Sequence, residues 1–197
     1  YVYSDIDFIL LGKLVETVSG KRLDDYVQME FYEPMGLESI GYNPLNRLPI
    51  NRIAPTENEK TFRSQLLRGD VHDPGAAMFG APTGHAGLFS DAGDMAAILQ
   101  MLLNGGTYNG KQYLKKETID LFTAYHSEIS RRGYGFDKPE KDNATRPEPY
   151  PAKSASALTF GHTGYTGTCV WADPENKLIF VFLSNRVYPN GSELLLK

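Results

Sequence analysis

The sequence predicts an α+β fold in which an antiparallel sheet is flanked by helices. Apolar residues recur with helical spacing in several segments before residue 130, whereas strand-like sequence is concentrated between residues 157 and 190. In that last part, strand-like runs at 168–172 and 177–184 are separated by the turn sequence Asp173-Pro174-Glu175-Asn176. Helices and strands that are segregated along the chain are typical of α+β domains.

Composition limits the classes of protein that need consideration. The chain has 197 residues, enough for one domain with a sizeable core, and nothing indicates two full domains. Lysine and arginine number 20 against 24 aspartate and glutamate, and the basic residues are scattered, which argues against a nucleic-acid partner. No apolar run reaches the length of a membrane span. The single cysteine, Cys169, excludes an internal disulfide and any multi-cysteine metal site, and its strand-like neighbours predict a buried structural thiol.

Residues 1–40 are expected to form a helical hairpin. Helical spacing predicts a first helix from Ile6 to Val18, which Gly20 ends as a C-cap; its apolar face carries Ile6, Leu10, Leu14 and Val18. A second helix is expected from about Leu23 to Phe31, with Pro34 and Gly36 stopping it and with these side chains inward: Tyr26, Val27 and Phe31.

Residues 41–90 are expected to be a long loop region, because helical periodicity fades and prolines recur at positions 44, 49, 55, 74 and 82. A loop of this length is uncommon unless it lines a site or packs as a lid. The sequence Asp70-Val71-His72-Asp73 offers possible metal ligands, but ordinary turn chemistry explains it better, so no metal site and no cofactor are predicted.

Residues 91–130 are expected to be helical. One helix should start after an N-cap at Ser90 or Asp91 and end at Asn104-Gly105-Gly106, burying Met95, Ile98, Leu99 and Leu102. A shorter helix should run from Lys116 to about Tyr125. The polar, proline-rich segment 130–156 is expected to be surface, with a short strand at 133–136.

Residues 157–190 should carry the sheet. The unbroken apolar run from Leu178 to Leu183 predicts a central strand that is covered on both faces. The stretch Phe160 to Gly167 has three glycines in seven residues, which lets the backbone approach a ligand closely, together with hydroxyls from Thr163, Tyr165 and Thr166. Taken alone, this stretch could equally be a glycine-rich strand end with a surface histidine.

Several segments, in order, resemble the serine β-lactamase and penicillin-binding-protein superfamily, in its class C-like branch of β-lactamase-related esterases and D-aminopeptidases. Tyr3-Ser4-Asp5 resembles the family's Tyr-Ser-Asn box, and 84–94 is similar to its Gly-Gly-x-Gly-Leu-x-Ser segment. The segment 104–114 resembles its Asn-Gly-Gly loop, and 161–167, Gly-His-Thr-Gly-Tyr-Thr-Gly, its third box. The resemblance implies the β-lactamase/transpeptidase-like fold, with residues 1–197 as the C-terminal portion of one such domain.

The family's first box, Ser-x-x-Lys, has no match, since no serine here has a lysine three residues later. In relatives this box lies well upstream of the tyrosine box, which implies that it precedes Tyr1 in a longer protein. The helical pattern close to Tyr1 and the helix-like sequence at 192–197 also suggest an excised piece. On this interpretation the fragment alone should be inactive, and an uncovered sheet edge or apolar face is expected on it.

The resemblance also implies roles for residues in the tyrosine box. Tyr3 matches the tyrosine that shuttles a proton between the serine nucleophile and the leaving group, and Ser4 matches a substrate-binding position. Asp5 stands where many members have asparagine. A carboxylate accepts hydrogen bonds only and adds negative charge, whereas an amide can donate to a substrate carbonyl.

In the third box, His162 replaces the lysine found in many members, and a histidine is mostly neutral at pH 7. Thr163 and Thr166 are expected along the edge where the substrate lies, and a side chain at Gly164 would crowd the acyl group. The backbone N–H of Tyr165 matches one oxyanion-hole donor. His162 and Asp5 together are expected to attract a substrate carboxylate less, which predicts weak β-lactamase activity and better turnover of esters or peptides.

The resemblance therefore implies a serine hydrolase that acts through an acyl-enzyme on an ester, an amide or a peptidoglycan-type peptide. A non-catalytic relative that binds peptidoglycan or scaffolds a partner domain is the alternative. Some bacterial relatives carry this domain after a family 3 glycoside hydrolase, which implies the periplasm or the cell envelope.

Overall fold

The computed structural model describes residues 2–80 and 82–189, so Tyr1 and the helix-like sequence at 192–197 lie outside the described residues. The chain divides into two compact units, described here one at a time. One comprises Met95–Leu183, and the other comprises Val2–Asp94 with the segment that begins at Ser184. Within the described ranges, no helix combines the length and the apolar character needed to cross a membrane.

In the unit that starts at Val2, helix α1 spans Asp5–Ser19 and ends as predicted at Gly20. Gly20 has φ +69°, a left-handed conformation that suits glycine, and its N–H donates to the carbonyl of Glu16. The predicted apolar face is not buried, however: Ile6, Leu10, Leu14 and Val18 are all exposed. Gly12 is the buried residue of this helix.

The second helical segment continues through Pro34, which the sequence predicts as a stop. It comprises α2 (Leu23–Val27), a π-helical turn η1 (Gln28–Tyr32) and α3 (Glu33–Met35). The wider π turn lies directly before the short helix that contains Pro34, and the nitrogen of this proline has no hydrogen to donate to the helical hydrogen bonds. Gly36, at φ +74°, ends it. Leu23, Tyr32 and Met35 are buried, and the residues predicted to point inward, Tyr26, Val27 and Phe31, are half-buried.

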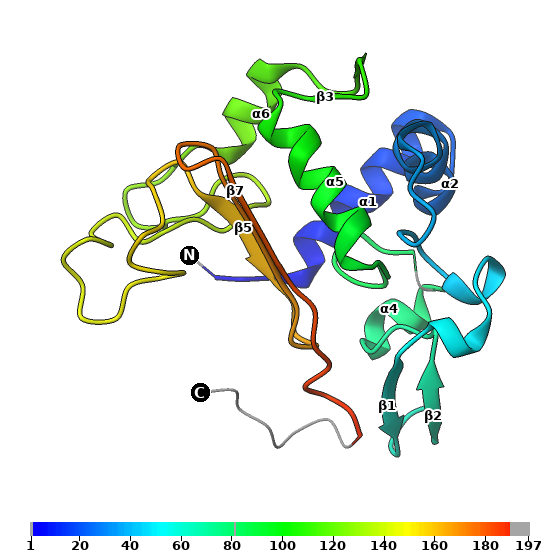
Figure 1. The fold of residues 1–197 in the computed structure, drawn as a ribbon. Helices are drawn as coiled ribbons and strands as arrows, with labels where there is room; N and C mark the ends of the chain where they lie inside the picture. Colours follow the sequence, from blue (N-terminus) through cyan, green and yellow to red (C-terminus); the bar gives the residue numbers. More distant parts are fainter. Residues whose placement is uncertain (1, 81, 190–197) are drawn as a thin grey trace. The chain divides into compact units, whose positions relative to one another are not determined.

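The segment 41–90 contains regular structure where a long loop is predicted. It holds an antiparallel hairpin, β1 (Pro55–Glu59) with β2 (Gln65–Arg68), and the helix α4 (Pro74–Met78) (Figure 1). Two short 3-10 turns, η2 (Pro44–Asn46) and η3 (Ile50–Arg52), precede the hairpin. The Glu59 carboxylate organises the hairpin loop by accepting hydrogen bonds from the backbone of Thr61, Phe62, Arg63 and Ser64.

The other unit is built on α5 (Ala92–Leu103), inside whose first turn the division between the units falls. Asp91 caps this helix, since its carboxylate accepts from the N–H of Asp94 at 2.9 Å. A two-stranded ribbon follows, β3 (Thr107–Tyr108) with β4 (Lys111–Gln112), and then α6 (Lys116–Thr123). Ile119 of α6 is buried, whereas Phe122 is exposed.

The sheet consists of three antiparallel strands, β5 (Phe160–Thr163), β6 (Cys169–Asp173) and β7 (Leu178–Phe182), in the order β5-β6-β7 (Figure 1). Leu99 of α5 packs against Phe160 and Ala172 in the core of this unit. Ile179 and Val181 face the same core. The predicted hairpin at Asp173 is therefore confirmed, with Val170 opposite Val181.

Strand β7 corrects one expectation. It is an edge strand of the described sheet, and its burial alternates instead of being complete. Leu178, Phe180 and Phe182 are exposed because successive side chains of a strand point to opposite faces and only one face meets α5. An uncovered apolar face and strand edge were expected on this chain, and both are present among the described residues.

Candidate functional site

The predicted site residues fall into two groups, one in each unit. Tyr3, Ser4 and Asp5 lie together at the start of α1, and His162 to Thr166 lie together at the end of β5 and in the turn after it. The expected joint effect of Asp5 and His162 on a substrate carboxylate stays a prediction.

Ser4 is the N-cap of α1. Its backbone is extended, with φ −143° and ψ 128°, and its Oγ accepts a hydrogen bond from the N–H of Ile6 at 3.3 Å. Asp5 is the first helical residue, where a negative charge is favoured by the helix dipole. Tyr3 directly precedes this cap and its side chain is 53% exposed. The cap thus fixes the direction in which the backbone carrying Tyr3 leaves the helix.

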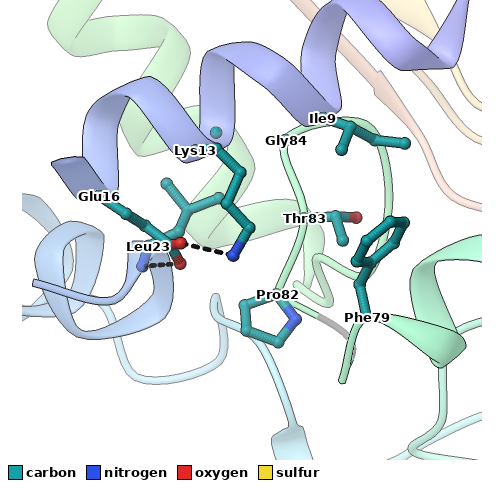
Figure 2. A pocket seen from close by; sticks show the side chains of 9 residues that line it. Ile9, Lys13, Glu16, Leu23, Phe79, Pro82, Thr83 and Gly84 are labelled. Atoms are coloured by element: carbon teal, nitrogen blue, oxygen red, sulfur yellow. Dashed lines mark hydrogen bonds and ion pairs between the residues drawn. The ribbon is translucent and has the colours of Figure 1, made fainter.

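Two glycines bring the 84–87 segment directly against α1 (Figure 2). A Cβ at Gly84 would lie 2.1 Å from the carbonyl oxygen of Phe8, and one at Gly12 would lie 3.0 Å from the nitrogen of Gly84. A small pocket opens beside this contact, lined by α1 residues, by Leu23 and Phe79 and by residues 82–84. The glycine-rich segment that begins at Gly84 therefore packs directly against α1, the helix that begins at the tyrosine box.

His85 of that segment has a structural partner. Its Nε2 lies 3.1 Å from Oδ1 of Asp73, whose carboxylate also accepts from the N–H of Ala76 at 2.6 Å and caps α4. Partial burial would raise the pKa of Asp73, but the hydrogen bonds from Ala76 and His85 outweigh it and lower that pKa. This geometry agrees with a role for His85 within the turn rather than in catalysis.

His162 on β5 makes two hydrogen bonds through its ring. Nε2 lies 2.8 Å from Nη1 of Arg132, and Nδ1 lies 2.7 Å from the carbonyl oxygen of Thr163. The ring is half-buried, whereas the side chain of Thr163 is exposed. The role of Arg132 could not be predicted from the sequence, because this arginine lies 30 positions before His162 in a segment predicted to be surface.

That segment is partly buried and anchors β5. Asp137 and Gly161 exchange backbone hydrogen bonds of 2.7 and 3.0 Å, and the side chain of Asp137 is 1% exposed. A Cβ at Gly161 would lie 2.0 Å from the carbonyl oxygen of Val170, so the strand needs glycine where Asp137 approaches it. The expected strand at 133–136 does not form; a single bridge from Asp137 to Gly161 takes its place.

Asp137 is held by several donors. Arg131 binds it bidentately, at 2.7 and 3.0 Å, and the hydroxyl of Tyr150 donates to it at 2.8 Å. Burial would raise the pKa of Asp137, but the hydrogen bonds from Arg131 and Tyr150 lower it below the usual value. Burial and the neighbouring carboxylate raise the pKa of Tyr150 to about 12.

The turn after β5 is tight. The N–H of Gly164 donates to the carbonyl of Thr168 at 2.7 Å, and that of Gly167 to the carbonyl of Gly164 at 3.0 Å. A Cβ at Gly164 would lie 2.4 Å from Oγ1 of Thr168, so packing within the chain itself already favours glycine at this position. Tyr165 projects from the turn, 66% exposed, and Thr166 is half-buried beside it.

Cys169 begins β6, half-buried, and burial raises the pKa of its thiol. Within residues 2–80 and 82–189, no three histidine, cysteine, aspartate or glutamate side chains gather in a way that could hold a metal ion.

Comparison with known proteins gives a consistent family. The family model described as "Beta-lactamase" matches residues 1–196. A relative from Escherichia coli K12 named "Putative D-alanyl-D-alanine carboxypeptidase" is 41% identical over 94% of this chain, and one of the same name from Salmonella enteritidis is 36% identical. In both cases the chain spans 45% of the relative's length.

Solved structures share the fold. A beta-lactamase from Mycobacterium bovis aligns over 94% of this chain and 56% of its own, with a TM-score of 0.61 and 20% identity. A penicillin-binding protein homolog from Caulobacter crescentus aligns over 91% of this chain and 50% of its own, with a TM-score of 0.59 and 20% identity. The family match covers nearly the whole chain, and it agrees with the order of the boxes and with the fold: the chain belongs to the beta-lactamase family.

Proposed function

We propose that the full-length protein containing this chain is a serine hydrolase that acts through an acyl-enzyme on a peptidoglycan-type peptide ending in D-alanine, or on a related ester or amide. This chain spans 45% of the length of its curated relatives. The nucleophile is assigned to the part of the protein outside this chain. The names of those relatives, D-alanyl-D-alanine carboxypeptidases, support the substrate class. The fragment alone is expected to be inactive.

The edge of β5 carries this proposal. Hydrogen-bonding direction alternates along a strand, so the backbone of Thr163 points to the same edge as that of Gly161, away from β6. Asp137 occupies this edge at Gly161, and Thr163 lies beyond it with an exposed side chain. An extended peptide can add to such an edge through main-chain hydrogen bonds. The tight turn at Gly164 then leads the chain to Tyr165, the proposed oxyanion-hole donor.

Tyr3 is the proposed proton shuttle between the serine, the leaving group and water. A tyrosine hydroxyl has an ordinary pKa near 10, so exchange near neutral pH requires donors or cations near its oxygen. The lysine of the Ser-x-x-Lys box in the remainder of the protein is the proposed source of such a cation.

A substrate panel tests the proposal. The full-length protein should release D-alanine from a peptide ending in D-Ala-D-Ala or hydrolyse a p-nitrophenyl ester. It should hydrolyse nitrocefin more slowly than the ester, because Asp5 and His162 are expected to attract a substrate carboxylate less and the ester has none. Nitrocefin hydrolysis much faster than ester hydrolysis would contradict the assigned preference.

Substitution of Tyr3 separates chemistry from fold. Tyr3→Phe should lower kcat by roughly 10²- to 10⁴-fold, the usual contribution of a positioned general acid or base. Tyr134→Phe is the matched control, because Tyr134 is also exposed, stacks on His126 and lies outside the sequence segments that match the family's boxes. Equal activity of Tyr3→Phe and the wild type would remove Tyr3 from the mechanism. Peptidoglycan binding without turnover of any substrate would favour the non-catalytic alternative.

The same relatives support a location at the cell envelope, and the periplasm is the compartment we propose. Fusion to a family 3 glycoside hydrolase stays a prediction from resemblance, which the sequence of the full gene would test.

A further inference from the structure

The contact between Arg132 and His162 indicates which nitrogen of the imidazole ring carries the proton. The guanidinium nitrogen Nη1 lies 2.8 Å from Nε2, a normal length for a hydrogen bond. A guanidinium has N–H donors and no acceptor, so the imidazole must accept at Nε2. That nitrogen is therefore unprotonated.

The other ring nitrogen has the opposite requirement. Nδ1 lies 2.7 Å from the carbonyl oxygen of Thr163, which can only accept, so Nδ1 must carry the proton. Both contacts are satisfied together only by the neutral imidazole with its proton on Nδ1. A doubly protonated ring would point an N–H at the arginine and place two cations in contact.

Arg132 is itself held in place. Its Nη2 lies 3.5 Å from Oδ2 of Asp137, whose buried carboxylate is also bound by Arg131 and whose backbone pairs with Gly161, next to His162. Among the contacts described here, the charged group next to His162 is Arg132, with Asp137 and Arg131 behind it. On β6, Val170 is the residue paired with His162.

We propose that Arg132 is a positioning residue that holds His162 as the neutral Nδ1–H imidazole and itself supplies the positive charge at the start of the His-Thr-Gly box. The cation at this end of the box is then a guanidinium beside the strand. Its consequence for catalysis rests on the proposed function, whereas the protonation state of the ring does not.

The test is NMR of the full-length protein with ¹⁵N-labelled histidine, using long-range ¹H–¹⁵N correlations that distinguish protonated from unprotonated ring nitrogens. His162→Gln assigns the signal. In the wild type, Nδ1 should be protonated and Nε2 unprotonated at pH 7. In Arg132→Ala, the His162 ring should populate both tautomers at the same pH. Arg132→Lys, which keeps the cation and a donor, should restore the wild-type pattern.

Arg146→Ala is the matched control, because Arg146 lies in the same loop segment and pairs with Glu140 and Asp142. It should leave the His162 spectrum unchanged. A wild-type ring protonated on Nε2, or an Arg132→Ala ring with the wild-type tautomer pattern, would overturn the inference even if other variants fold poorly. An equal effect of Arg146→Ala would show general loosening of the loop and would also overturn it.

An activity measurement adds the catalytic consequence. In the proposed hydrolase, Arg132→Ala should lower kcat/KM, and Arg132→Lys should restore it. An unchanged kcat/KM in Arg132→Ala would contradict the catalytic part. A protein without hydrolase activity would refute the proposed function and leave the NMR result standing.

Discussion

Lys138 is a buried ammonium group, with a residue exposure of 2%. Its Nζ donates to the carbonyl of Thr159 at 3.1 Å and lies 4.7 Å from the ring centre of Tyr125. These neighbours do not replace the lost hydration, and burial lowers the pKa of Lys138 to about 8.

This shift predicts a pH dependence of stability. Between pH 8 and about 10.4, the ordinary value for lysine, the unfolded chain keeps this proton while the folded chain loses it, so this group makes the free energy of unfolding rise with pH. Lys138→Met should reduce the rise between pH 8 and 9.5, measured by urea unfolding of the full-length protein. The exposed Lys153→Met is the control and should keep the wild-type slope. A wild-type slope in Lys138→Met would contradict the assignment.

The pKa of Asp173 is also lowered, here because its ionised carboxylate accepts stabilising hydrogen bonds. Burial would raise its pKa, but donors from Ser156, Glu175 and Asn176 outweigh this and hold the pKa well below the usual range. The resulting stability is present above about pH 3.9 and is lost as the pH falls below it.

Asp173→Asn should therefore destabilise the full-length protein at pH 7 by about 1.5–3 kcal/mol, the usual contribution of one hydrogen bond to a charged group. Denaturant unfolding at pH 7 measures this loss, and the loss should shrink toward pH 3. Glu175→Gln on the same turn is the control, since the Glu175 side chain is exposed. Equal losses from both variants would show that the Asp173 carboxylate is not the cause.

At the scale of elements, the contact between α1 and the 84–87 segment depends on Gly12 and Gly84. Gly84→Ala should destabilise the full-length protein by about 1–3 kcal/mol, because the new methyl group would overlap the carbonyl of Phe8. Lys13→Ala, one position from Gly12, removes a surface ion pair with Glu16 and should cost less than about 1 kcal/mol. Thermal unfolding measures both; a Gly84→Ala cost no larger than that of Lys13→Ala would contradict the close contact.

The sequence predicted those elements whose signals are local. Helical spacing and capping residues gave α1 and α5 nearly to their ends, and the turn at Asp173 gave the β6–β7 hairpin. The β1–β2 hairpin was missed because the side chain of Glu59, rather than an apolar pattern, organises its loop.

The candidate site could be predicted only where a residue's own segment defines it. Ser4 at a helix start and Gly164 in a turn follow from local sequence. Arg132 and Asp137 could not be predicted, since their importance arises from pairing with a strand some 30 residues later. A polar segment is interpreted as surface because its sequence does not show which of its charged side chains form ion pairs in the folded chain.

For the whole molecule, the exposed apolar surfaces are the main physical feature. Leu178, Phe180 and Phe182 on β7, and separately Ile6, Leu10 and Leu14 on α1, form apolar faces of the kind that soluble proteins normally cover. We expect the remainder of the full-length protein to cover them.

The isolated chain should therefore bind a hydrophobic dye such as ANS and self-associate, whereas the full-length protein should do neither. Phe180→Ser should reduce dye binding by the isolated chain and lower the thermal stability of the full-length protein. A monomeric isolated chain without dye binding would contradict this picture, as would a full-length protein that tolerates Phe180→Ser without loss of stability.

The central claim, that this chain supplies part of an acyl-enzyme site, is tested most directly by labelling the full-length protein with a fluorophosphonate probe and locating the adduct by mass spectrometry. We predict one labelled serine, in a Ser-x-x-Lys sequence outside residues 1–197, with labelling abolished when that serine is replaced by alanine and slowed by Tyr3→Phe. Absence of labelling, or labelling that persists after the serine is replaced, would contradict the account.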